Sequence, residues 1–74
     1  MNEEYIPLHI HVGRKIRKVR KDDGRSGLWL ARKVGVTPQA ISAIETGKSA
    51  VSLDRLERIA YFLGVSTAYL VNRR

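Results

Sequence analysis

The sequence predicts an all-α fold of five short helices that follow an extended N-terminal arm. Three features of its 74 residues indicate this fold. Apolar residues recur at helical spacing from Val12 onward, a serine or threonine stands before each later apolar segment, and glycine follows most of these segments as a helix stop. The length allows one domain. We expect the arm to cover residues 1–11 and the helical domain residues 12–72.

The arm is predicted from residues 5–12, where every second residue is apolar: Ile6, Leu8, Ile10 and Val12. This two-residue period is that of a β-strand, but Pro7 lacks an amide proton and limits the segment to an edge strand or an extended arm. His9 and His11 would share one side of such a strand. No third metal ligand stands near them in the sequence, so we expect surface histidines and no metal site.

The first two helices follow from spacing and capping residues. The apolar residues of the first recur every three or four positions: Val12, Ile16 and Val19. A turn cluster that ends at Gly24 closes this helix. Ser26 is expected to cap a second helix over residues 27–34. Gly35 follows directly and can take the left-handed conformation that stops a helix.

Three further helices are predicted in the same way. Thr37 is expected to cap a third helix over residues 38–45, which begins with Pro38, where a missing amide proton costs no hydrogen bond. Ser52 precedes a fourth helix with an apolar stripe: Leu53, Leu56, Ile59, Ala60 and Leu63. Ser66 opens a short fifth helix. Only residues 35–37 link the second helix to the third, and such a link, with glycine first, is typical of a helix-turn-helix unit.

The charge of the chain favours a polyanionic partner. The net charge is +7, from 14 basic and 7 acidic residues, and residues 13–48 hold this whole excess. A basic surface on a small domain is typical of nucleic-acid binding, although a solvated helix face has a similar composition. There is no cysteine for a disulfide or a thiolate metal site, and no apolar run is long enough to cross a bilayer. The acidic, polar first residues predict no secretory signal, and we expect a cytoplasmic, nucleoid-associated protein.

From Val12 to Leu70 the sequence resembles the Cro/repressor-type helix-turn-helix domain of phage and bacterial regulators. The matching residues run through all five helices: Gly13, Ile16, Arg17, Arg20, Ser26, Leu30, Ala31, Gly35-Val36-Thr37, Ile41-Ser42, Ile44-Glu45, Gly47-Lys48, Ser52-Leu53, Leu56, Ile59-Ala60, Leu63-Gly64-Val65-Ser66 and Leu70. The resemblance implies a compact five-helix repressor-like domain that binds double-stranded DNA and needs no cofactor. The sequence departs from the family at Gly27, where glutamine is common, at Val51, where proline is common, and at Trp29, where a charged residue is common.

The resemblance assigns base reading to the third helix, residues 38–45. One helix fits the major groove of DNA, whose floor distinguishes all base pairs. The positions that match Pro38, Gln39 and Ala43 commonly meet bases in the family. The Gln39 amide can both donate to and accept from one adenine edge, whereas Pro38 and Ala43 offer only apolar contact. Ser42 is expected to bond to a base or a phosphate.

Phosphate contacts are expected on both sides of this helix, and they would fix its register on the duplex. The amides at the start of the second helix point outward at the positive end of its dipole, which suits a phosphate. Arg25 lies beside the position of the missing glutamine. The loop after the third helix supplies the other contacts, and the full expected set is Arg25, Ser26, Gly27, Thr46, Lys48 and Ser49.

Arg20 and Glu45 match a pair of residues with a structural role in the family. There an arginine and a glutamate pair between the first and third helices. The resemblance therefore implies an ion pair that orients the reading helix without touching a base.

We expect a transcription regulator, a repressor or autoregulating control protein that binds a palindromic operator as a symmetric dimer. A lone reading helix touches too few base pairs for a unique site, and two copies double the contact. The dimer interface is expected from apolar residues near the C-terminus: Tyr61, Phe62, Tyr69 and Val71. The apolar residues of the arm are a second candidate.

A second hypothesis is an antitoxin or adaptor that binds a partner protein. Leu28 and Trp29, which lie outside the predicted core stripe, and the apolar arm keep this hypothesis open. An enzyme is not expected, because no nucleophile–base pair and no metal cluster is visible in the sequence.

Overall fold

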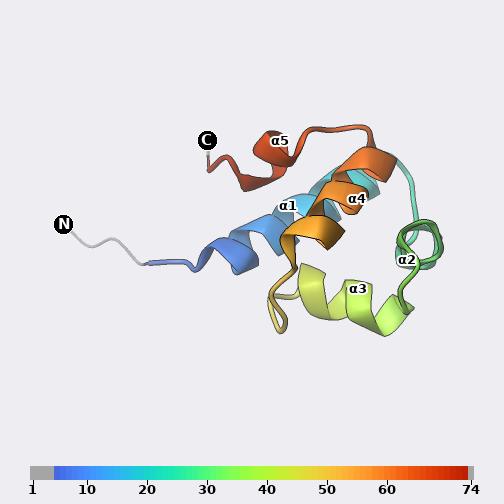
Figure 1. The fold of residues 1–74 in the computed structure, drawn as a ribbon, viewed down its shortest axis with the longest axis horizontal. Helices are drawn as coiled ribbons and strands as arrows, with labels where there is room; N and C mark the ends of the chain where they lie inside the picture. Colours follow the sequence, from blue (N-terminus) through green and yellow to red (C-terminus); the bar gives the residue numbers. More distant parts are fainter. Residues whose placement is uncertain (1–4, 74) are drawn as a thin grey trace.

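The computed structural model describes residues 5–73 and contains five helices, α1 to α5, in chain order (Figure 1). Their bounds are α1 Leu8–Asp22, α2 Gly27–Val34, α3 Pro38–Glu45, α4 Leu53–Leu63 and α5 Thr67–Val71. No strand occurs in this part of the chain. The predicted all-α five-helix fold is confirmed.

Four of the helices begin in the same way, with a hydroxyl side chain as the N-cap. Ser26, Thr37, Ser52 and Ser66 each accept a hydrogen bond from the backbone amide three residues later, at 2.9, 3.1, 3.2 and 3.0 Å. Each bond satisfies one of the amides that a helix start leaves without a partner. The four N-caps predicted from the sequence are therefore confirmed, and they fix where α2 to α5 begin.

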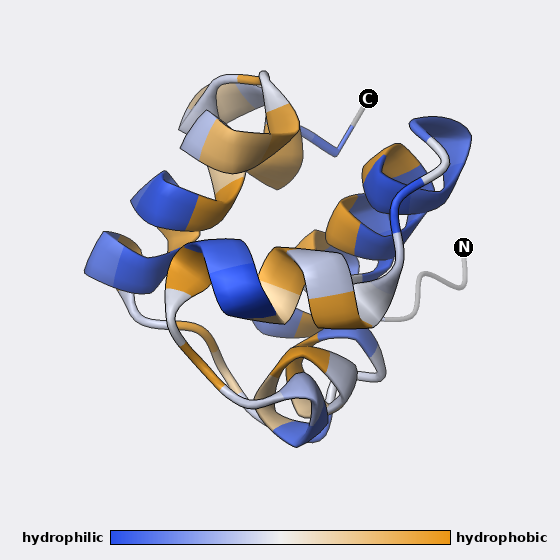
Figure 2. Cartoon of the chain, turned by 90° about the vertical axis from the view of Figure 1, so that its right-hand side faces the viewer, coloured by the Kyte–Doolittle hydropathy of each residue, from blue (hydrophilic) through white to orange (hydrophobic). Residues whose placement is uncertain are grey.

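One apolar core joins all five helices. Its buried residues are Val12, Ile16, Leu30, Ala31, Val34, Ile41, Ile44, Leu56, Ile59, Ala60, Leu63 and Leu70. Figure 2 shows hydrophobic and hydrophilic segments alternating along the helix ribbons, as expected for helices with one buried face. In this arrangement α1 packs against α3, α4 and α5, while α2 packs against α3 and α4.

The expected extended arm over residues 1–11 is wrong for residues 8–11, because α1 begins at Leu8. Pro7 is the N-cap, a position where the missing amide proton costs nothing. The added helical turn packs against the rest of the fold, since the Ile10 side chain lies against Gly47 and His11 Nε2 is 2.8 Å from the Asn72 carbonyl oxygen. Residues 5–7 are not helical. The remainder of the predicted arm, residues 1–4, lies outside the described residues.

Candidate nucleic-acid interface

α3 has one buried and one exposed face. Ile41, Ile44 and Glu45 are buried, whereas Pro38, Gln39 and Ser42 are exposed. Ala43, the fourth predicted base-contact residue, is half-buried. The three exposed residues lie at positions one, two and five of the helix, so they belong to its N-terminal turns, the part expected to meet base edges.

The turn between α2 and α3 holds the two helices at a fixed angle. Gly35 ends α2 with a φ of +86°, a conformation that residues with a Cβ resist. Its amide donates to the Ala31 carbonyl at 2.9 Å, and the Val36 amide donates to the same carbonyl at 3.0 Å. The Thr37 cap then starts α3 directly.

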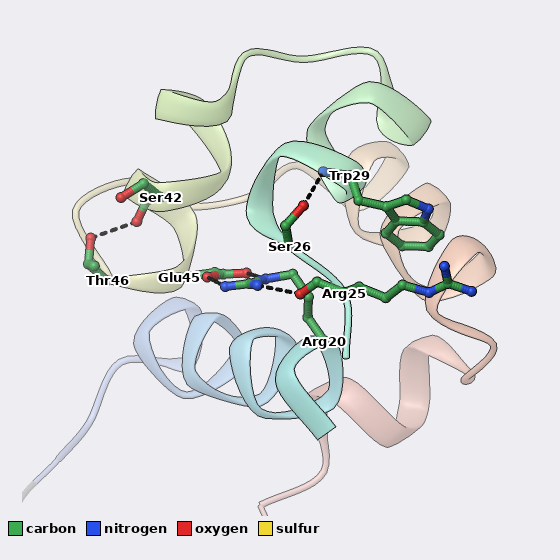
Figure 3. A network of polar contacts seen from close by, with 7 residues as sticks. All are labelled: Arg20, Arg25, Ser26, Trp29, Ser42, Glu45 and Thr46. Atoms are coloured by element: carbon green, nitrogen blue, oxygen red, sulfur yellow. Dashed lines mark hydrogen bonds and ion pairs between the residues drawn. The ribbon is translucent and has the colours of Figure 1, made fainter. Parts of the chain in front are cut away.

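Arg20 ties this two-helix unit to α1. Its Nε donates to one carboxylate oxygen of Glu45 at 2.7 Å and its Nη2 to the other at 2.8 Å (Figure 3). Its Nη1 donates to the backbone carbonyl of Arg25 at 2.7 Å. The Arg20 and Glu45 side chains are only 10% and 4% exposed. One guanidinium therefore fixes both the C-terminal end of α3 and the chain that leads into α2, and it has no contact with the exposed face of α3.

The positive charge of the Arg20 guanidinium does not change over the ordinary pH range. The hydrogen bond to Glu45 raises the pKa of Arg20, the charge of Glu45 raises it further, and burial acts in the opposite direction. A cation with a raised pKa stabilises the fold fully below its unfolded pKa and loses this contribution only as the pH rises through the folded value. The guanidinium therefore remains charged near neutral pH.

A close approach of α1 to α3 depends on a buried glycine. A Cβ at Gly13 would overlap the carbonyl oxygen of Ile44 and lie 3.0 Å from its carbonyl carbon. Both atoms belong to the α3 backbone and cannot move as the end of a flexible side chain can. Gly13 therefore sets how closely α3 lies against α1. The resemblance matched this glycine, but sequence reasoning missed its role, because only the crossing of two helices reveals it.

The start of α2 gathers donors suited to an anion. The Ser26 hydroxyl accepts from the Trp29 amide and keeps its own proton for another bond. The amides of Gly27 and Leu28 lie in the first turn, where a helix offers them no acceptor. The Arg25 guanidinium stands over the Trp29 ring, 4.4 Å from its centroid, which is a cation–π contact (Figure 3). Trp29, whose role was not predicted, thus holds the cation beside the helix start.

The three phosphate contacts predicted in the loop after α3 differ in whether their side chains are already hydrogen-bonded within the chain. The Thr46 hydroxyl donates to the Ser42 carbonyl at 2.8 Å (Figure 3), and the Thr46 amide donates to the same oxygen at 3.0 Å. The Lys48 and Ser49 amides both donate to the Ala43 carbonyl, at 2.9 and 3.1 Å. The polar hydrogens of Thr46 are therefore used in closing α3. The side chains of Lys48 and Ser49 are exposed.

The four predicted dimer residues do not form one cluster. Tyr61 is 76% exposed and its ring meets Phe62 edge-on, with centroids 5.1 Å apart, near the end of α4. Tyr69 carries the Lys15 ammonium 4.7 Å above its ring and lines a hollow with Val19. Val71 borders a different surface, which contains Leu8 and Leu53.

The described residues, 5–73, hold neither a metal-binding cluster nor a membrane-spanning helix. No group of three or more His, Cys, Asp or Glu side chains in this range is arranged to hold a metal ion. None of the helices there is long and apolar enough to cross a membrane.

The helix-turn-helix family matches residues 16–70, most of the chain. The chain belongs to this family. The Cro/repressor-type resemblance is thereby confirmed, and the matched region covers the last two turns of α1, all of α2 to α4 and most of α5.

Relatives of this helix-turn-helix domain include an HTH-type transcriptional regulator of Sinorhizobium medicae, which is 36% identical over 63 residues. The match covers 85% of this chain and 45% of that protein, so the chain spans about half the length of the curated relatives it matches. The clp gene regulator ClgR of Corynebacterium glutamicum has the same fold, with a TM-score of 0.86, 30% identity and 89% and 86% of the two chains covered.

Two further proteins of known structure contain the same fold in different contexts. The biofilm master regulator SinR, solved in complex with DNA, has a TM-score of 0.77 and 34% identity, over 82% of this chain and 98% of that one. SinR has also been solved in a complex with the protein SinI. The fold further matches 37% of the chain of HppE, solved with iron(II) and substrate, at 28% identity and a TM-score of 0.79. The fold alone therefore does not decide the function.

Proposed function

We propose that this chain is a sequence-specific double-stranded DNA-binding regulator of transcription, a repressor or autoregulating control protein, that inserts α3 into the major groove. The observation that carries the proposal is the division of α3 into a buried face and an exposed face. Its inner face is held by the core and by the Arg20–Glu45 pair, and its outer face offers Gln39, Ser42 and Pro38 to a partner. A regulator of this kind works at the nucleoid, in the cytoplasm.

Gln39 is the main base-reading residue in this proposal. Its amide both donates and accepts, and it is exposed at the second position of α3. A glutamine at such a position pairs with the N6 and N7 atoms of one adenine. Ser42 adds a hydrogen bond, and Pro38 and Ala43 add apolar contact, for example with a thymine methyl group.

Phosphates are held on both sides of α3. On one side the Ser26 hydroxyl, the first-turn amides of α2 and the Arg25 guanidinium bind one phosphate group. On the other side Lys48 and Ser49 contribute their exposed side chains. Thr46 shapes the loop rather than binding DNA, because its hydroxyl is donated to Ser42. These contacts set the register and carry no sequence preference themselves.

A palindromic operator read by two copies completes the proposal. One α3 contacts only a few base pairs, whereas two copies related by a twofold axis read half-sites about 10 bp apart. Gathering two such sites on one assembly raises both affinity and selectivity.

A second candidate function, an antitoxin or adaptor that binds a protein, is favoured by one observation. Leu28 is 46% exposed on α2 beside Trp29, and the two side chains line a shallow hollow of about 490 Å³ with Arg32 and Lys33. This surface lies next to the proposed phosphate site and offers apolar contact with a cationic rim to an acidic partner.

Selection from a pool of random DNA duplexes tests the proposed function. We expect the chain to enrich a palindrome with half-sites about 10 bp apart, with affinity that falls steeply as salt concentration rises. A protein-binding adaptor would enrich no sequence above the starting pool. Binding of all duplexes with equal affinity would also contradict sequence-specific regulation.

A further inference from the structure

Trp29 is the one tryptophan of the chain and the third residue of α2. Its half-buried side chain packs against the apolar core. The ring also meets a cation, because the guanidinium carbon of Arg25 lies 4.4 Å from the ring centroid. Among aromatic side chains tryptophan attracts a cation most strongly, since the face of its ring carries partial negative charge. The core therefore holds the indole in place, and the indole in turn holds the head group of Arg25.

The backbone of Arg25 is held as well, at both its amide and its carbonyl group. The amide donates to the Arg20 carbonyl at 3.0 Å, and the Arg25 carbonyl accepts from Nη1 of Arg20 at 2.7 Å. Arg20 is itself held by its two hydrogen bonds to Glu45. In Figure 3 the Arg25 side chain leads away from this pair and passes beside the Trp29 ring. The two ends of the Arg25 side chain are thus fixed by separate parts of the fold.

The hydrogen-bond donors of the Arg25 guanidinium remain available. Within residues 5–73 its contacts are the Trp29 ring and the Asp23 carboxylate, one oxygen of which lies 3.8 Å from Nε. This distance is too long for a hydrogen bond, and the Arg25 and Asp23 side chains are 48% and 55% exposed, so their attraction is weak. A contact with the face of a ring uses no N–H group. Arg25 is therefore an ordered cation whose donors are free to bind an acidic group.

The charges around Trp29 favour a partner with several phosphates. Arg32 and Lys33, both exposed, line the hollow that Trp29 borders on α2, and Arg25 stands over the ring. Each strand of a duplex carries a phosphate at every nucleotide, so it can meet neighbouring cations at the same time. Arg25 is the one charged residue of positions 24–28. A phosphate contact at the start of α2 therefore depends on Arg25 for its charge.

We propose that Trp29 is a positioning residue for DNA binding, whose ring holds the Arg25 guanidinium ready for a phosphate before the duplex arrives. An unrestrained arginine side chain samples many rotamers and loses this freedom when it binds. The ring restricts these rotamers in the free chain, so less entropy is lost in the complex. The inference rests on the proposed function, which assigns a phosphate to Arg25, and it adds a residue that acts only through that arginine.

A double-mutant cycle on duplex affinity tests the coupling between the two residues. Trp29→Leu keeps an apolar side chain against the core but removes the aromatic face, whereas Trp29→Phe keeps an aromatic face. With a labelled duplex of mixed sequence, we expect Arg25→Ala to weaken binding about tenfold and Trp29→Leu about three- to fivefold. Trp29→Phe should bind within about twofold of wild type. In the Arg25→Ala background, Trp29→Leu should cause no further loss, because the ring acts only through Arg25.

The salt dependence of binding separates positioning from direct contact. Arg25→Ala removes one cation from the complex, so the slope of log affinity against log salt should fall by roughly one. Trp29→Leu keeps that cation, and its slope should stay at the wild-type value. Thermal melts show whether each variant is folded at the temperature of the binding measurement. Losses that multiply in the double variant would overturn the proposal, and so would wild-type affinity in a folded Trp29→Leu chain.

Quenching of Trp29 fluorescence tests the contact without DNA, because the chain has one tryptophan. A cation beside the ring attracts iodide, whereas uncharged acrylamide measures only how accessible the ring is. We expect Arg25→Ala to lower the ratio of iodide to acrylamide quenching about twofold. Arg17→Ala, which removes an exposed arginine of α1, is the control and should leave the ratio unchanged. An unchanged ratio in Arg25→Ala would show that the guanidinium does not stay over the ring in solution, and the proposal would fail.

The same measurements separate this inference from the proposed function. If the chain binds every duplex equally while Trp29 and Arg25 remain coupled, sequence-specific regulation fails and the positioning role stands. If the chain selects a palindrome and the two losses multiply, the positioning role fails alone. A chain that binds no duplex would contradict both.

Discussion

The two faces of α3 differ in their contacts with the rest of the molecule: the inner face is packed and hydrogen-bonded, whereas the outer face is exposed. On the inner face, Ile41 and Ile44 are in the core and both carboxylate oxygens of Glu45 are bonded to Arg20. On the outer face, Gln39 and Ser42 are exposed. The inner face thus fixes where the helix lies, and the outer face is available to a partner. Changes on the inner face should alter stability alone, and changes on the outer face should alter binding alone.

The largest effect is expected from Arg20→Ala. It leaves the Glu45 carboxylate buried without its partner, which costs about 3–5 kcal/mol of the free energy of unfolding. Arg17→Ala, an exposed arginine on the same helix, is the matched control and should change stability by less than about 0.5 kcal/mol. Thermal melts measure both. The same melts on Glu45→Ala and the double variant give the coupling energy, and additive losses would show that the pair does not act as a unit.

A smaller loss of stability is expected from Gly13→Ala. The added methyl group forces the backbones of α1 and α3 apart, and overpacking of this kind costs up to about 3 kcal/mol. Gly27→Ala provides the control, since a Cβ there meets nothing within 4 Å and its backbone is helical. It should be neutral or stabilise by up to about 1 kcal/mol. If Gly13→Ala and Gly27→Ala unfolded at the same urea concentration, the close approach of Gly13 to the Ile44 backbone would not constrain the position of α3.

On the outer face, Gln39→Ala should leave the melting temperature unchanged and weaken binding to the best operator. The expected loss is about 1–3 kcal/mol, with relaxed preference at one base position. Competition binding against duplexes that differ at single positions measures both. Unchanged affinity and preference would remove Gln39 from the reading set. A lowered melting temperature would show that the outer face of α3 also contributes to stability.

The smallest effect is expected from Lys48→Ala, which should weaken specific and non-specific duplexes about equally. It should also reduce the slope of log affinity against log salt by roughly one. Lys18→Ala is the control, because it removes the same charge. Lys18 lies five residues after Gly13, about 140° around α1 from the side that meets α3. The Lys18→Ala variant should keep the wild-type slope. A loss confined to one operator sequence would identify Lys48 as a base reader instead.

The α1 start shows why part of the fold could not be predicted. Leu8 and Val12 fit both the two-residue period of a strand with Ile6 and Ile10 and the helical period that continues to Ile16. The sequence offers no local signal that decides between these periods. The contact between Ile10 and Gly47 joins positions far apart in the chain, and it favours the helix.

The exposure of candidate interface residues was predictable where a residue matched a pattern that extends over the chain, whereas their contacts with DNA remain predictions. Gln39 and Lys48 were assigned from their places in the motif, and both are exposed. Thr46 was assigned in the same way, but its hydroxyl is donated to Ser42. Trp29 was a departure from the pattern, and its cation–π contact with Arg25 depends on side-chain positions that no spacing rule gives.

The sequence alone determined the local contacts, those between residues three or four positions apart. The caps at Ser26, Thr37 and Ser66 act on the amide three residues on, so the order of residues is enough to place the helix starts. The tertiary structure alone decided the approach of Gly13 to the α3 backbone and the hollow beside Leu53. These features join atoms from different helices, and their distances depend on how the whole core packs.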